Sequence, residues 1–527
     1  MPTNYSKSSA TILNSTIVVS LMTFVSRIFG MIRDIIFARV FGVSLAMDAF
    51  IVANRIPNML RRFFAEGAFN QGFVPVVSDY KEGKSHEEVK YLVDSVAGTL
   101  GLILFVITLI GVIISPILIS FVAPGFIGDD NRFELATSML RYTFPYLLFV
   151  SLTAFAGSVL NTYGRFAVPA FTPVLLNIVL IFFVLLISPS LENPGMALAY
   201  GVFCAGLIQL IFQLPFLSKI KLLPKPKWNI AHKGIKRILK LMGPAVFGSS
   251  IAQVNILVSG IIASLIGTGK ISLLYYSDRI MELPLSLFGI AIATVTLPYL
   301  SRLYSNNSMG KFSDAMNWSI RIACMLIIPA AIGLFVLAEP IIAAIFYGGM
   351  FDSHDVFLTA LSLKAFSIGL IGFSFVKILS PAYFARKDTL TPVKIGIFCL
   401  LLNIILGSSS VYYLSEIDYE GTHLGLALSI SVAAILNAGL LFSGLKKKNI
   451  IKRSPGFREF IVKLMIANSF MLIFLTYTMQ PLEWWLDLGV LKRFSWLTSF
   501  ILVSMGIYVL ILSLLGMKIK ELRFQEE

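Results

Sequence analysis

Stretches of roughly 20 apolar residues recur along almost the whole chain, and this repetition constrains its fold more than any other feature. Each stretch is long enough to cross the hydrocarbon of a bilayer as an α-helix. Hydrophobic residues make up 57% of the 527 positions and charged residues only 13%, whereas soluble chains usually contain about 25% charged residues. A soluble fold would need to bury every stretch in one core. The sequence therefore predicts an all-α membrane protein that crosses the bilayer many times.

The alternation of apolar and polar segments predicts about fourteen transmembrane helices. Their expected ranges are 13–32, 44–79, 92–123, 135–161, 168–189, 195–217, 236–267, 271–304, 315–346, 357–384, 391–414, 422–445, 458–479 and 493–516. The polar start of the chain and Arg27 in the first apolar run argue against a cleaved signal peptide. Cys204, Cys324 and Cys399 lie singly in apolar stretches and lack the spacing of a metal site or a disulfide framework.

Loop charge predicts that both termini are cytoplasmic. Cytoplasmic loops of membrane proteins carry an excess of Lys and Arg. Basic residues gather in the segments 219–237, 446–453 and 518–523, which the helix count places on one side of the membrane. The opposite side is acidic, with Asp129, Asp130, Glu192 and Asp352 among its residues. These loops largely explain the net charge of +15, so no nucleic-acid partner is expected.

Residues 44–217 and 271–445 look like two copies of one plan. Thr172-Pro173-Val174 in the first copy matches Thr391-Pro392-Val393 in the second. Each copy holds six expected spans, and parallel repeats are typical of transporters that bind substrate between two halves. The predicted domains are an N-lobe (1–217), a basic cytoplasmic linker (218–235), a C-lobe (236–445) related to the N-lobe by a pseudo-two-fold axis, and two extra helices with a cytoplasmic tail (446–527).

Several ionisable side chains fall inside expected spans, where each costs at least about 2.5 kcal/mol unless it meets a cavity or a partner. With their polar neighbours they are Ser26, Arg27, Arg33 and Asp34 on the first helix, Asp48, Arg55, Asn58, Arg61, Arg62 and Glu66 on the second, and Asp278, Arg279 and Glu282 on the eighth. Spacings of three and four residues would let Glu282 neutralise Arg279 and Glu66 neutralise Arg62. Asp34 could likewise neutralise Arg33, which the count places near the outer surface.

Arginine is the informative residue in this set. Its planar guanidinium binds phosphate oxygens in pairs and stays charged when desolvated. Arginines that converge from several helices would suit a diphosphate and would suit a cationic drug badly. We therefore expect Arg27, Arg33, Arg61 and Arg279 to line a hydrated substrate cavity together with Asn58. Ser26, Asp34, Arg62, Glu66, Asp278 and Glu282 are expected to support them.

Three segments resemble signatures of the MurJ (MviN) family of lipid II flippases. They are SRIFGMIRD at 26–34, IPNMLRRFFAEGAF at 56–69 and YYSDRIMELP at 275–284. The resemblance extends over nearly the whole chain. It implies the fold of the multidrug/oligosaccharidyl-lipid/polysaccharide exporter class, with two six-helix lobes, a central cavity and alternating access. It also implies that the four arginines line this cavity, and it places Asp48 at a functional acidic position that we assign to substrate binding.

The substrate implied by the resemblance is lipid II, an undecaprenyl-diphosphate-linked disaccharide pentapeptide. It would move from the inner to the outer leaflet of the bacterial cytoplasmic membrane for peptidoglycan synthesis. The two extra helices would form a hydrophobic groove suited to the lipid tail. Membrane lipids and the cell-wall synthesis machinery are the other expected partners. No cofactor or metal is assigned, and membrane potential and a cation remain alternative energy sources.

Two rival functions follow from the same sequence. A polysaccharide-lipid flippase or a drug/cation antiporter could share the fold, although an antiporter should place carboxylates rather than arginines in the cavity. A membrane enzyme acting on polyprenyl phosphates would need clustered acidic residues to hold magnesium. The pair Asp129-Asp130 is expected outside the membrane and is not accompanied by other residues of a catalytic magnesium site. We therefore expect a transporter rather than an enzyme.

Overall fold

The computed structural model describes residues 3–64, 67–452 and 455–517, with side chains described except at 3–16, 63–64, 67–68, 70 and 243–252. Helices make up the regular secondary structure of these residues, and their one β-type pairing is an isolated bridge between Gly348 and Phe351. The prediction of an all-α protein is confirmed. The chain divides into two compact units, Met1–Gly269 and Lys270–Glu527, which are described separately.

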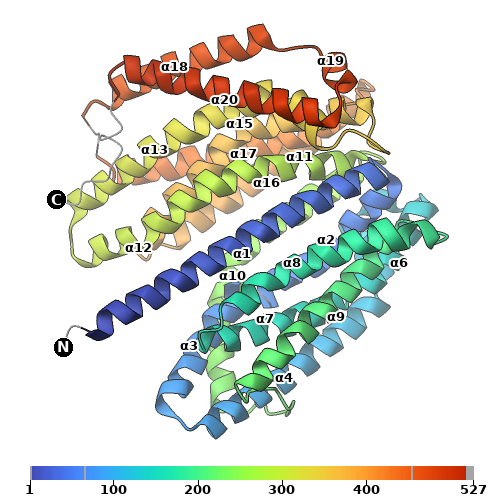
Figure 1. Cartoon of the computed structure of the whole chain (residues 1–527), viewed down its shortest axis with the longest axis vertical. Helices are drawn as coiled ribbons and strands as arrows, with labels where there is room; N and C mark the ends of the chain where they lie inside the picture. The colour runs from blue at the N-terminus through green and yellow to red at the C-terminus, as the bar shows by residue number, and fades with distance from the viewer. Residues whose placement is uncertain (1–2, 65–66, 453–454, 518–527) are drawn as a thin grey trace. The chain divides into compact units, whose positions relative to one another are not determined.

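The first unit contains ten α-helices among the described residues (Figure 1). They are α1 (Thr3–Phe41), α2 (Leu45–Phe64), α3 (Gly67–Gly83), α4 (His86–Ile113), α5 (Ser115–Val122), α6 (Asp130–Thr143), α7 (Tyr146–Thr162), α8 (Ala167–Phe182), α9 (Met196–Lys219) and α10 (Lys233–Ser264). A π-helical turn, η2 (Phe183–Ile187), extends α8. Helix α10 packs against α2, α3 and α4. It therefore belongs to this unit by contact, and the lobe boundary at 236 stays a prediction.

The second unit also contains ten α-helices within the described ranges. They are α11 (Lys270–Pro284), α12 (Ala291–Ser305), α13 (Met309–Val336), α14 (Ala338–Ile345), α15 (Ser353–Phe384), α16 (Leu390–Glu416), α17 (His423–Lys447), α18 (Phe457–Thr478), α19 (Leu482–Asp487) and α20 (Val490–Leu514). A π-helical segment, η4 (Leu285–Ile290), joins α11 to α12. Helices α18 and α20 pack side by side and contact α13 and α14 (Figure 1).

Eleven helical segments of the described chain are long and apolar enough to cross a membrane. They cover eleven of the fourteen expected spans. The other three expected spans correspond to α1, α2 with α3, and α10. In α1 and α2 the apolar character is interrupted by charged residues such as Arg27, Arg33, Asp48 and Arg61. The protein is thus a multi-pass membrane protein, and the number fourteen itself stays a prediction.

The two units repeat one pattern of helix packing. In the first, α7 and α8 pack on α9, and α2 packs on α6; in the second, α15 and α16 pack on α17, and α11 packs on α15. Both units also break one helix in the same way. The residues at these breaks are Ile114 and Leu337, each with φ −88° and ψ 14°, and each break precedes an eight-residue helix. Pro116 and Pro340 lie in the first turn of those short helices, where proline is tolerated. The internal repeat read from the sequence therefore has a structural counterpart.

Candidate functional site

Arg33, near the end of α1, is bound on both sides of its guanidinium. Its Nε and Nη2 donate to Oδ1 of the adjacent Asp34 at 3.0 and 2.7 Å, and its Nη1 donates to Oδ1 of Asn177 at 3.0 Å. Only 14% of the Arg33 side chain and 5% of the Asp34 side chain are exposed. Neutralisation of Arg33 by Asp34, one alternative from the sequence, is therefore observed. Arg27 differs, because its side chain is exposed.

Asn177 on α8 holds this part of α1 in place. Besides accepting from Arg33, its Nδ2 donates to the backbone oxygen of Ser26 at 3.2 Å. It therefore ties the turn that contains Arg27 to the turn that contains Arg33. The residue lies more than 140 positions from Arg33, and it is not among the site residues expected from the sequence. The signal that could have identified it is an asparagine inside an otherwise apolar span, because polar side chains there usually have a polar partner.

Replacing Asn177 by alanine should weaken the protein's activity several-fold and lower the free energy of unfolding by about 1–3 kcal/mol, because the buried partners lose their hydrogen bonds. Asn177→Asp is the matched control, since it keeps an acceptor for Arg33. Complementation at low expression and thermal unfolding in detergent measure the two effects. Wild-type behaviour of Asn177→Ala, or equal damage from the aspartate variant, would contradict the positioning role.

Asp48 is fully buried in the first turn of α2. Its Oδ2 accepts a hydrogen bond from the backbone N–H of Gly269 at 2.5 Å, so it fastens the start of α2 to the loop after α10. Gly269 has φ +82°, and an added Cβ would meet Val43, which accounts for glycine there. These contacts favour an anchoring role for Asp48, and its predicted contact with substrate stays a prediction.

The expected site residues Asn58, Arg61 and Arg62 follow Pro57, which lies inside α2. Arg61 Nε donates to Oδ1 of Asn58 at 3.4 Å, at a spacing of three residues. Arg62 Nη1 donates to Oε1 of Gln253 on α10 at 3.3 Å. Glu66, the predicted partner of Arg62, lies outside the described residues. Gln253 is a buried partner that the sequence analysis did not identify.

Arg55, one turn before Asn58, packs against α10 at a glycine. A Cβ on Gly260 would come within 1.3 Å of Arg55 Nη1, so only glycine leaves room for this guanidinium. The Nη1 atom is buried and has no hydrogen-bond partner among the residues that the structure describes. Arg55 was among the ionisable side chains noted inside the expected spans, but it was not assigned to the site. Its position adds a guanidinium to the α2–α10 contact.

Arg279 lies on α11 in the second unit. Its Nη1 donates to Oε2 of Glu282 at 3.1 Å, which confirms the predicted pair at a spacing of three residues. Its guanidinium also lies 4.9 Å from the ring centre of Tyr275. The side chain is 37% exposed, so part of the guanidinium remains accessible to a ligand. Asp278 beside it is exposed.

The structure thus brings predicted site residues together within each unit. Ser26, Arg33 and Asp34 meet through Asn177, and Asn58 meets Arg61. Arg279 belongs to the other unit, with Glu282. Convergence of arginines from the first, second and eighth expected spans therefore stays a prediction. Each local arrangement offers guanidinium groups, and polar groups that hold them, on α1, α2 or α11.

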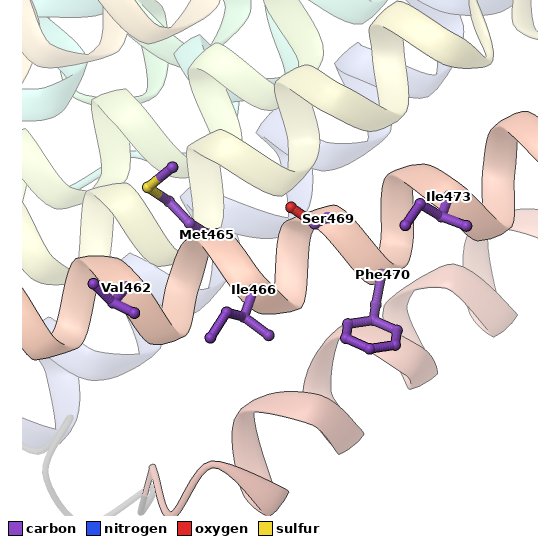
Figure 2. A pocket seen from close by; sticks show the side chains of 6 residues that line it. All are labelled: Val462, Met465, Ile466, Ser469, Phe470 and Ile473. Carbon is purple, nitrogen blue, oxygen red and sulfur yellow. The ribbon is translucent and has the colours of Figure 1, made fainter.

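An open apolar hollow of about 500 Å³ runs along α18. Figure 2 shows the six side chains that line it, all on this helix. They are Val462, Met465, Ile466, Ser469, Phe470 and Ile473. Ser469 is the single polar residue among them, so the hollow suits hydrocarbon rather than a polar ligand.

The sequence model of the family described as "Lipid II flippase MurJ" matches residues 37–493. A curated relative from Vibrio cholerae, named "Probable lipid II flippase MurJ", is 41% identical over 526 residues. This alignment covers 98% of the chain and 99% of the relative. Another from Burkholderia cenocepacia, named "Lipid II flippase MurJ", is 40% identical and covers 86% of the chain and 88% of the relative.

Solved structures show the same fold. One described as "Lipid II flippase MurJ, inward closed conformation" superposes with a TM-score of 0.74 and 28% identity, covering 95% of this chain and 98% of that one. A multidrug transporter of the MATE family in an inward-facing conformation gives a TM-score of 0.65 at 14% identity, covering 82% of this chain and 98% of that one. The second likeness concerns the fold alone.

Proposed function

Since the chain belongs to the MurJ family of lipid II flippases, we propose that it carries lipid II from the inner to the outer leaflet of the bacterial cytoplasmic membrane by alternating access. The observation that carries this proposal is the match of the family over residues 37–493. The intramembrane arginines and the predicted parallel repeat support it. The protein is a multi-pass inner-membrane transporter, and we infer that it makes no covalent change to its substrate.

A diphosphate linked to sugars and peptide cannot cross hydrocarbon unaided, because its polar groups would lose their hydrogen bonds to water. A hydrated cavity removes this cost while the polyprenyl tail stays in lipid. In this mechanism the guanidinium groups of Arg27, Arg61 and Arg279 bind the diphosphate when the cavity opens inward. Rocking of the two halves then exposes the headgroup outside.

Different arginines take different roles in this proposal. Arg27 is exposed and Arg279 is partly exposed, so both can exchange their present contacts for phosphate oxygens. Arg33 is already neutralised by Asp34 and held by Asn177. We therefore assign Arg33 a positioning role on α1. Asp48 similarly positions the start of α2, because its carboxylate is buried against the Gly269 backbone.

The hollow on α18 is the proposed site for part of the lipid tail. Its lining is almost entirely apolar, and Met465, Phe470 and Ile473 are more than half exposed. Several exposed apolar side chains grouped on one helix favour a hydrocarbon partner. The tail would then remain beside α18 while the headgroup moves.

The remaining points of the proposal concern orientation, energy source and partners. Both termini lie in the cytoplasm, because the basic segments 219–237 and 446–453 then face inward. An inside-negative potential favours outward movement of the negative headgroup, by about 2.3 kcal/mol per charge per 100 mV. Coupling to this potential or to a cation, and contact with the cell-wall synthesis machinery, belong to the proposal. A drug antiporter fits less well, because arginine is the commonest charged residue of α1 and α2.

Depletion of the sole copy in growing cells tests the function. We expect lipid II to accumulate, its exposure to a membrane-impermeant probe on the outer leaflet to fall, and the cells to lyse. Restoring the wild-type chain should reverse all three effects. Growth arrest with undiminished outer-leaflet exposure of lipid II would overturn the proposal and direct attention to another polyprenyl-linked substrate.

A further inference from the structure

Residues 221–230, between α9 and α10, form an extended strap fixed along α4. The backbone N–H of Lys225 donates to Oδ1 of Asp94 at 2.7 Å, and that of Lys227 donates to the Asp94 carbonyl at 3.0 Å. Asn229 Nδ2 donates to the hydroxyl of Tyr91 at 3.0 Å. At Gly98 an added Cβ would lie 2.3 Å from the Lys227 carbonyl oxygen, so the strap lies directly on α4. Its backbone is bound along α4, and most of its side chains are exposed, although Leu222 is buried in the core.

The strap contains both basic and apolar side chains, and most of its residues are exposed. Lys221, Lys225 and Lys227 are exposed. Leu223, Trp228 and Ile230 are 41%, 56% and 46% exposed. The surrounding stretch 219–241 contains no Asp or Glu. This surface therefore combines positive charge with apolar side chains that water solvates poorly.

The strap lies where α4 changes from polar to apolar. Asp94 is the last charged residue of α4, and no charged residue follows it until Asp129. Beyond the strap, α4 presents the exposed side chains of Leu102, Phe105 and Leu109, which suit lipid. Helix α9, a candidate span, ends at Lys219, directly before the strap. Both observations place residues 221–230 at the boundary between hydrocarbon and water.

We propose that the strap is a binding surface for anionic phospholipid headgroups. Lysines near a membrane surface attract anionic lipids, and tryptophan prefers the headgroup region because its ring is apolar and its N–H is polar. Trp228, Leu223 and Ile230 enter this region while Lys221 and Lys225 bind lipid phosphate. Lys227 reaches back over the ring of Tyr91, with its Nζ 5.1 Å from the ring centre. This surface is separate from the route proposed for lipid II.

Fluorescence quenching of Trp228 tests the proposal in the full chain reconstituted into phosphatidylcholine vesicles. A minor fraction of the lipid is acyl-brominated phosphatidylglycerol in one set and equally brominated phosphatidylcholine in the other. The contribution of Trp228 is the difference between the wild type and Trp228→Phe. We expect stronger quenching of this contribution by the brominated phosphatidylglycerol, because the strap gathers anionic lipid around itself.

A charge variant and a matched control separate headgroup selectivity from simple contact. Lys221→Gln with Lys225→Gln should reduce the preference for phosphatidylglycerol, by up to about fivefold for each lysine removed. Lys446→Gln with Lys447→Gln removes two exposed lysines at the end of α17 and should leave the Trp228 signal unchanged. Equal quenching by the two brominated lipids would overturn the proposal. Quenching by aqueous iodide but by neither lipid would also overturn it, because the strap would then lie in water.

Discussion

Cells that depend on an Arg279→Ala variant are expected to stop growing, although the variant still inserts into the membrane. Arg279 is 37% exposed, and its local partners are Glu282 and the ring of Tyr275. Removing the guanidinium leaves the exposed carboxylate of Glu282 without this cation and deprives the diphosphate of a bidentate donor. Complementation of a depletion strain and outer-leaflet exposure of lipid II measure the loss, which should approach that of an empty vector.

The Arg279→Lys variant distinguishes the contribution of the positive charge from that of the planar guanidinium. Lysine keeps the positive charge but lacks the planar fork, so Arg279→Lys should restore growth poorly. Arg302→Ala provides a matched control, because Arg302 also lies over a tyrosine ring, at 5.4 Å from the centre of Tyr299, at the exposed end of α12. This variant should grow normally. Normal growth of Arg279→Ala would remove Arg279 from the proposed substrate contacts, and full activity of Arg279→Lys would show that charge alone is sufficient.

The helices and the repeat could be predicted because they depend on local patterns. Apolar length marks a span whatever its neighbours are, and each expected range overlaps a helix. Residues three apart on a helix must be neighbours, so the Arg279–Glu282 pair followed from spacing alone. The neutralisation of Arg33 by Asp34 was foreseen as an alternative because the two residues are adjacent in the sequence.

Contacts between distant segments could not be predicted, because spacing gives no information about which helices pack together. Asn177 binds Arg33 across 144 positions, and Gln253 binds Arg62 across 191. Neither residue belongs to a charged motif, so each looks unremarkable in an apolar sequence. Gly260 is similar, since its importance depends on Arg55 packing against it. The sequence indicated which charges need partners, and the three-dimensional packing identified those partners.

A second large effect is expected at Arg493, the buried arginine at the start of α20. Its Nε and Nη2 donate to the carbonyls of Trp485 and Leu486 at 2.9 Å each, and its Nη1 donates to the carbonyl of Ala343 at 3.3 Å. These carbonyls lie in the last turns of α19 and α14, where helices leave acceptors without internal partners. The positive charge also suits the negative ends of both helix dipoles.

Replacing Arg493 by alanine should therefore lower the free energy of unfolding by about 3 kcal/mol or more, because several buried carbonyls lose a charged donor at once. Trp485, which is fully buried, should become accessible to quenchers as α19 separates from α20. Thermal unfolding in detergent and tryptophan quenching measure the two effects. Arg493→Lys should recover only part of the lost stability, since the ammonium group of lysine cannot reproduce the planar guanidinium that donates to three carbonyl oxygens.

Arg458→Ala is the control for the Arg493 variants, because Arg458 lies exposed at the start of α18, in the same helical pair. It should unfold at the wild-type temperature. Because α20 packs against α18, loosening α20 should also disturb the hollow proposed for the lipid tail. Transport by Arg493→Ala should then fall even at temperatures where the rest of the chain stays folded. Wild-type unfolding of Arg493→Ala, with Trp485 still protected, would show that α14, α19 and α20 are held together by apolar packing alone.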